Sequence, residues 1–146
     1  MLNSSLHNES TFYHVFVEDL LHAKREVVIE SSFITSGRMK RLSSIFQTLV
    51  DNNIKIYVVT RNPNEHPEPM NYQAEKEIRK FEEIGVQVLI YKKGHHRKLA
   101  VIDRKILWEG SLNILSQNDS REFMRRIDNK KITEQTFKFL NLERYF

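Results

Sequence analysis

Residues 96–113 read HRKLAVIDRKILWEGSLN, and this stretch carries more chemical information than any other part of the chain. It contains a His-x-Lys triplet, then Asp103 after four residues, and Gly110-Ser111-Leu112-Asn113 after six more. A histidine can act as a base or nucleophile near neutral pH, and a lysine can hold a phosphate oxygen as a point charge. Such a set can bind a phosphodiester and attack it without a metal ion.

The spacing within the stretch places its polar groups around two short predicted strands. His96 and Lys98 are two residues apart, so in an extended segment their side chains project to the same side. Ser111 and Asn113 follow Gly110 at the start of a predicted short helix, where backbone N–H groups attract anions. A glycine at 110 removes the side chain that would block a phosphate from the backbone. Taken singly, each residue also fits an ordinary surface role; together they favour a phosphodiester site.

Outside this stretch, strands alternate with helices along most of the chain. Strands of β-branched residues are expected at 26–31, 54–60 and 86–91, and helices with apolar residues at helical spacing lie before and between them. The remaining expected elements are helices at 12–24, 39–49 and 71–84, strands at 98–102, 105–109 and 122–127, and a final helix capped by Thr133. This order predicts an α/β helix–sheet–helix sandwich with a mixed, partly parallel sheet. We expect residues 1–146 to form a single domain.

Composition restricts the classes of function. The chain has 146 residues, of which 40% are hydrophobic and 29% are charged, as in soluble globular proteins. No apolar run is long enough to span a bilayer, and no cysteine is present for a disulfide or thiolate metal site. The N-terminus lacks the features of a signal peptide, so a cytoplasmic location is expected. A net charge of +4 is compatible with a polyanionic partner, although many soluble proteins are equally basic.

The pattern HxK, four residues, D, six residues, GSxN resembles the signature of the phospholipase D superfamily, and every defining position is present. The segment WEGSLNILSQNDSREFMRRI, at 108–127, is similar to phospholipase D-like nuclease modules found alone, in restriction enzymes or at the C-termini of bacterial helicases. The resemblance covers most of the chain. It implies a phospholipase D-like fold and phosphodiesterase chemistry.

The resemblance also implies roles for particular residues. His96 is the nucleophile that would form a phosphohistidine intermediate, and Lys98 and Asn113 would hold the phosphate oxygens, with Ser111 in support. Glu122 corresponds to the downstream acidic residue that orients the catalytic imidazole. The neighbouring sequence, REFMRR, departs from the commoner Glu-Asn ending of this part of the family pattern.

The other polar residues near the motif are assigned from their position. Asp103 has the opposite strand parity from His96, so we interpret it as structural, closing the turn between the two motif strands. Arg61 and Arg97 are candidate substrate-binding residues, together with Gly110. The further arginines that could line a groove for a polyanion are Arg104, Arg121, Arg125 and Arg126. No carboxylates cluster near the motif, so we expect neither a metal nor another cofactor.

A single copy of the motif is half of the catalytic site that the family mechanism needs. In that mechanism one histidine attacks phosphorus while a second protonates the leaving oxygen. No other histidine of the chain stands in an HxK context, and His95 points away from His96 in a regular strand. We therefore expect a homodimer that brings two His96 side chains together at a two-fold axis. Its interface should include 110–117.

Three functional hypotheses follow from the sequence. The first is a metal-independent nuclease that cuts DNA, or less favourably RNA, as a homodimer. The second is the same chemistry on a lipid or a DNA adduct, although no amphipathic membrane helix is evident. The third is a non-catalytic module for nucleic-acid docking and dimerisation within a larger helicase or restriction system.

Overall fold

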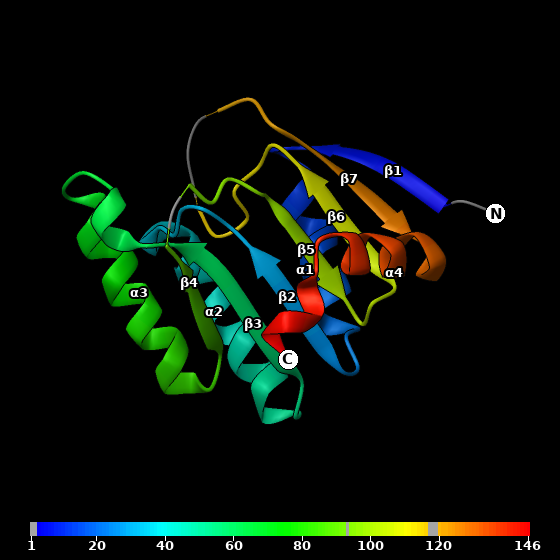
Figure 1. Cartoon of the computed structure of the whole chain (residues 1–146), viewed down its shortest axis with the longest axis horizontal. Coiled ribbons are helices and arrows are strands. Elements are labelled where there is room, and N and C mark those ends of the chain that lie inside the picture. The colour runs from blue at the N-terminus through cyan, green and yellow to red at the C-terminus, as the bar shows by residue number, and fades with distance from the viewer. Residues whose placement is uncertain (1–2, 93, 117–119) are drawn as a thin grey trace.

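The computed structural model describes residues 3–92, 94–116 and 120–146. Within these ranges, seven strands form one sheet in the order β1-β7-β6-β5-β2-β3-β4 (Figure 1). The strands are β1 (Asn3–Asn8), β2 (Glu26–Glu30), β3 (Lys55–Arg61), β4 (Gln87–Tyr91), β5 (Leu99–Ile102), β6 (Ile106–Gly110) and β7 (Phe123–Asp128). The α-helices are α1 (Phe12–Leu21), α2 (Ser36–Asp51), α3 (Met70–Ile84) and α4 (Lys130–Phe139), and the short 3-10 helices are η1 (Pro63–Glu65) and η2 (Leu142–Tyr145).

The first half of the sheet is parallel. Strand β2 pairs with β3 and β3 with β4 in parallel register, and helices α2 and α3 form the crossovers. All five residues of β2 are buried, as expected for a central strand covered on both faces. Helix α3 ends at Gly85, which has a φ of 104°, a left-handed conformation that glycine adopts without a steric penalty. This part of the prediction is confirmed.

The second half of the sheet is antiparallel. Strand β5 pairs with β2 on the side away from β3, and β6, β7 and β1 continue the sheet from there. The sequence did not predict β1, because Asn3–Asn8 reads NSSLHN, without an apolar alternation. The strand forms because all six of its residues pair with β7 through the backbone.

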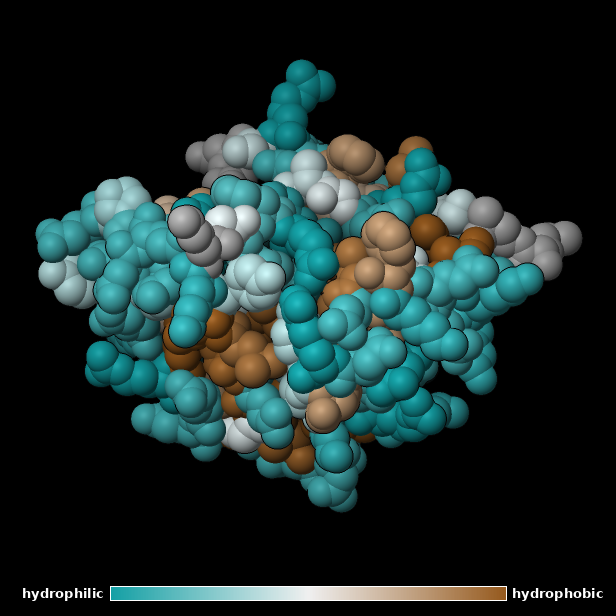
Figure 2. Space-filling view, in the orientation of Figure 1, coloured by the Kyte–Doolittle hydropathy of each residue, from teal (hydrophilic) through white to brown (hydrophobic). Residues whose placement is uncertain are grey.

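Helices cover both faces of the sheet, which confirms the predicted sandwich. Helices α1, α2 and α3 pack on one face around large buried side chains, among them Phe12, Phe46, Phe81 and Trp108. Helix α4 and η2 pack on the other face, which is turned toward the viewer in Figure 1. On that face, apolar surface is exposed beside β3 and β4 (Figure 2). No helix in the described part of the chain is both long and apolar enough to cross a membrane.

Two local predictions were wrong. Residues 111–116 do not form a helix, because their backbone bonds to the segment that connects β2 to α2: Thr35 donates to the carbonyl of Leu115 at 2.9 Å. Thr133 does not cap α4; Asn129 does, accepting a hydrogen bond from the N–H of Ile132 at 2.9 Å. Thr133 lies inside the helix and donates to the carbonyl of Lys105 at 2.8 Å.

Asp103 lies in the turn between β5 and β6, at the opposite end of β5 from His96. Its carboxylate accepts hydrogen bonds from the backbone N–H groups of Lys24 and Arg25, both at 2.8 Å, and of Glu26 at 3.0 Å. Asp103 itself has a φ of 54°, in the left-handed region that aspartate tolerates better than most residues. The side chain thus joins the hairpin to the beginning of β2.

We expect Asp103→Ala to lower the free energy of unfolding by about 1–2 kcal/mol, because the part-buried N–H of Glu26 loses its charged acceptor, whereas the more exposed N–H groups of Lys24 and Arg25 can bond to water. Urea unfolding followed by circular dichroism measures this change. Asp51→Ala is the control, since within the described ranges the Asp51 carboxylate accepts one hydrogen bond, from the exposed amide of Gln47 at 2.9 Å. Equal effects of the two substitutions would show that the Asp103 contacts do not support the fold.

Candidate active site

Two serines at the end of β2 hold the two halves of the motif together. The hydroxyl of Ser32 donates to the carbonyl of His95 at 2.6 Å, and the N–H of Ser32 donates to Oδ1 of Asn113 at 3.0 Å. The hydroxyl of Ser31 accepts a hydrogen bond from the N–H of Leu115 at 3.2 Å. Both serines are fully buried. The His-x-Lys and Gly-Ser-x-Asn segments are therefore fixed relative to each other through a third segment of the chain.

An open cavity of about 540 Å³ lies beside the His-x-Lys segment. Both His96 and Lys98 line it, as their spacing predicts. The ring of His96 is exposed, and Nζ of Lys98 donates to the carbonyl of His96 at 2.7 Å. That bond uses one of the three ammonium donors of Lys98, so two others are available to an anion. The lining of this open cavity also includes Arg97, Gly110, Phe123 and Arg125.

Asn113 and Glu122 line a different and much smaller cavity, of about 40 Å³, together with Arg38. The backbone N–H of Glu122 donates to Oε1 of Glu9 at 2.9 Å. Among the described residues, no hydrogen bond or ion pair joins Glu122 to the ring of His96. The assignment of Glu122 as the residue that orients His96 therefore stays a prediction.

Arg97 and His95 point into the protein, toward a buried carboxylate. Arg97 donates to both oxygens of Glu30, at 2.8 and 2.6 Å, and Glu30 is fully buried. Nε2 of His95 lies 3.7 Å from the same carboxylate. Burial lowers the pKa of His95, and Glu30 opposes part of that shift. Burial also acts to lower the pKa of Arg97, but the bonds to Glu30 outweigh it, and the net shift is upward.

The orientation of His95 away from His96 is thus confirmed. Arg97, predicted to bind substrate, lines the open cavity, but two of its donors are committed to Glu30. Removing one partner of a buried ion pair of this kind strongly destabilises the folded protein, because the other charge is left buried and unpaired. Arg97 therefore makes a structural contact that its position in the sequence did not predict.

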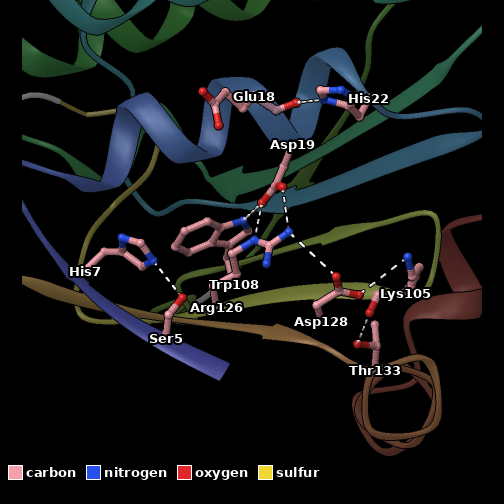
Figure 3. A network of polar contacts seen from close by, with 10 residues as sticks. All are labelled: Ser5, His7, Glu18, Asp19, His22, Lys105, Trp108, Arg126, Asp128 and Thr133. Atoms are coloured by element: carbon pink, nitrogen blue, oxygen red, sulfur yellow. Dashed lines mark hydrogen bonds and ion pairs between the residues drawn. The ribbon is translucent and has the colours of Figure 1, made fainter. Parts of the chain in front are cut away.

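The remaining arginines divide between the faces of the sheet. Arg125 is exposed and lines the open cavity, whereas Arg126 donates to both oxygens of Asp19, at 2.8 Å each, on the other face (Figure 3). Their opposite directions agree with the prediction. Arg61 lies largely buried at the end of β3, with Nε 3.8 Å from Oε2 of Glu65, and does not line the open cavity. Arg104 stacks on Phe137, 4.4 Å from the ring centroid to Cζ, at the far end of β5.

Ser111 and Gly110 are both constrained by β7. The hydroxyl of Ser111 accepts a hydrogen bond from the N–H of Phe123 at 3.1 Å. A Cβ at Gly110 would collide with the carbonyl oxygen of Phe123 and lie 2.9 Å from Cα of Met124. The structure therefore explains the glycine by the close approach of β6 and β7, a reason different from the predicted access of a phosphate to the backbone.

Several residues of this region were not predicted from the sequence. Ser32 and Glu30 could have been noticed, because polar residues directly follow or end a buried, β-branched strand. Phe123 carried no signal, yet its side chain is 53% exposed at the rim of the cavity. An exposed phenylalanine beside a basic groove can stack on a nucleobase or pack against a partner chain.

Comparison with protein families identifies this architecture. The profile described as "Cardiolipin synthase, PLD-like domain" matches residues 16–141, most of the chain. The chain belongs to the phospholipase D superfamily. Members of this superfamily are phosphodiesterases, so the cavity lined by the His-x-Lys segment is a candidate site for phosphodiester chemistry. No curated protein matches the chain significantly.

Solved structures share the fold at low sequence identity. Nuc from Salmonella typhimurium, a phospholipase D family member, matches with a TM-score of 0.76 at 14% identity over 95% of this chain and 91% of its own. NucT from Helicobacter pylori matches with a TM-score of 0.71 at 17% identity over 95% and 93%. Phosphatidylserine synthase from Haemophilus influenzae matches with a TM-score of 0.73 at 16% identity over 97% of this chain and 38% of its own. The chain is thus similar in extent to Nuc and NucT.

We expect Ser32→Ala to destabilise the fold by about 1–2 kcal/mol, because the buried carbonyl of His95 loses its donor. The backbone contact of Ser32 with Asn113 is retained in this variant. Ser43→Ala is the matched control, since the Ser43 hydroxyl donates to the carbonyl of Met39 within its own helix. Urea unfolding of both variants measures the difference; a loss of stability no larger than that of the control would contradict the proposed tether.

Proposed function

We propose that this protein is a metal-independent phosphodiesterase that hydrolyses nucleic acid, DNA in preference to RNA, as a homodimer. The observation that carries the proposal is the exposed imidazole of His96 in an open cavity whose lining also includes Lys98 and Arg125. A nucleophile and two cations at one cavity suit an anionic phosphodiester. Asn113 is held nearby through Ser32.

In the proposed reaction, a ring nitrogen of His96 attacks phosphorus and the bond to the leaving oxygen breaks. The imidazolium of His96 from the second copy donates its proton to that oxygen. Water then attacks the phosphohistidine, the second imidazole accepts the proton of the water, and the P–N bond breaks. Lys98 stabilises the negative charge that develops on the phosphate oxygens. Every protein group in this scheme is His96 or Lys98 of one of the two copies.

The dimer is proposed because one chain supplies one His-x-Lys segment. A two-fold axis beside His96 would bring two identical segments together, and the exposure of its ring permits this approach. Phe123, exposed at the cavity, and the apolar surface beside β3 and β4 in Figure 2 provide area for such an interface. The expected interface segment, 110–117, is described only to residue 116; Gln117 lies outside the described residues.

Nucleic acid is proposed as substrate because the chain is basic and the cavity carries cationic side chains. TrmBL2, an archaeal chromatin protein whose structure shows a mode of DNA binding, shares the fold with a TM-score of 0.65 at 13% identity over 96% of this chain and 51% of its own. It also supports the alternative of a non-catalytic docking module, within a helicase or restriction system. The similarity to phosphatidylserine synthase supports the other alternative, a lipid phosphodiester.

We expect the purified protein to cleave DNA in excess EDTA, and His96→Ala to lower the rate by at least about a thousandfold, because no other group replaces the nucleophile. Agarose and denaturing gels with plasmid, single-stranded DNA and RNA measure the cleavage. His22→Ala is the matched control, since His22 lies at the end of α1. Turnover of phospholipid alone would favour the lipid alternative, and DNA binding without turnover the docking alternative.

We expect His96→Ala to inactivate the wild-type chain when the two are refolded together. With a ninefold excess of the variant, about one wild-type chain in ten pairs with another wild-type chain, so activity per wild-type chain falls about tenfold. Mixing the folded proteins just before the assay is the control, because subunits have not yet exchanged. Unchanged activity after refolding together would show that one chain forms the whole site.

A further inference from the structure

A second large cavity lies at the opposite edge of the sheet from His96. It has a volume of about 500 Å³, within the range of small-ligand sites. Strand β5 runs between the two cavities, and the seven residue steps from His96 to Asp103 span at most roughly 25 Å when extended. Four basic side chains line this second cavity: Lys24, Arg25, Lys105 and Lys130.

The two carboxylates in this cavity are already occupied by other partners. Asp19 accepts from Arg126 at 2.8 Å through each oxygen, and from the indole of Trp108 at 2.8 Å (Figure 3). Asp103 accepts the three backbone N–H groups at the start of β2. Neither is free to neutralise the basic side chains. Carboxylates outside the cavity lining pair with two of these cations: Arg25 lies 3.8 Å from Glu26, and Lys105 lies 3.6 Å from Asp128. In the described part of the chain, Lys24 and Lys130 have no ion-pair partner.

Helix α4 adds positive charge at the same place. Lys130 is its first residue, and the first turn contains no acidic residue. The N-terminus of a helix carries a partial positive charge, so lysines there are unfavourable unless an anion lies nearby. The ten residues of α4 are packed against the sheet, which holds this terminus in place.

The floor of the cavity is apolar. Ile102 is almost fully buried and Ile106 is half-buried, and both line the cavity beneath the cationic rim. An apolar floor under basic side chains suits a ligand with a phosphate at one end and an apolar or aromatic body at the other. A polynucleotide backbone, which is charged along its whole length, fits this combination less well.

We propose that this cavity, defined by Lys24, Arg25, Lys105 and Lys130 above Ile102 and Ile106, binds a small organic phosphate of the size of a nucleoside monophosphate. The site is separate from the His96 cavity, and its occupancy requires no catalysis. The proposal goes beyond the proposed function and does not depend on it.

The test is calorimetric titration of the intact protein with adenosine 5′-monophosphate, adenosine and inorganic phosphate. We expect the monophosphate to bind with a Kd of about 1 mM or tighter, and the two fragments at least about tenfold more weakly, because each makes only part of the contacts. The double variant Lys24→Gln/Lys130→Gln should weaken binding of the monophosphate by at least about tenfold. Lys131→Gln/Lys138→Gln, which removes the same charge outside the cavity, should leave it unchanged.

Lys98→Ala separates this site from the catalytic cavity and should bind the monophosphate normally. Absence of binding, loss of binding in Lys98→Ala rather than in the cavity variant, or equally tight binding of inorganic phosphate would overturn the proposal. Binding of an oligonucleotide but not of the monophosphate would also overturn it. If the double variant does not fold, the amide resonances of Lys24, Asp103 and Lys130 in the wild-type protein must shift on titration. Failure of DNA cleavage with binding intact would reject the proposed function alone.

Discussion

The two hydrogen bonds of Ser32 are the constraint on which the candidate site depends. The β5–β6 hairpin by itself brings Lys98 and Gly110 to the same edge of the sheet, but Asn113 lies beyond the end of β6 and outside any helix. The position of Asn113 is set by the hydrogen bond from the N–H of Ser32 to its Oδ1. The hydroxyl of Ser32 also donates to the carbonyl of His95 and so fixes the backbone before His96. A catalytic group held within a fraction of an ångström requires such support from surrounding residues.

The sequence predicted well what depends on side chains near one another in the chain. Periodic apolar residues located the parallel strands and their helices, and the His-x-Lys spacing predicted that His96 and Lys98 lie at one cavity. The catalytic roles of His96, Lys98 and Asn113 stay predictions. It failed where distant backbone groups decide the structure: β1 exists because β7 pairs with it, and 111–116 stays non-helical because it bonds to the segment after β2. The partner of Arg97, Glu30, is 67 residues away, so no local pattern could reveal it.

The positions of the unpaired cationic side chains depend on which other cations form ion pairs with the carboxylates. Glu30 binds Arg97 and Asp19 binds Arg126, so the donors of these arginines are committed to carboxylates of the protein rather than to a ligand. The cations left without a carboxylate partner in the described part of the chain, such as Lys98 and Lys130, lie at opposite ends of the sheet. A modest net charge of +4 thus accompanies two separate basic cavities, one at each end of β5.

The surroundings of His96 bear on the proposed dimer. Its ring is exposed and has no hydrogen-bond partner among the described residues, whereas the adjacent His95 is buried beside Glu30. A nucleophilic imidazole needs a fixed orientation and a second group to protonate the leaving oxygen. Neither is found at this position among the residues that the structure describes, while the tethered 110–116 segment and the exposed Phe123 lie at the same edge. In the proposed homodimer, a second copy related by a two-fold axis would supply the missing imidazole without requiring any further residue type.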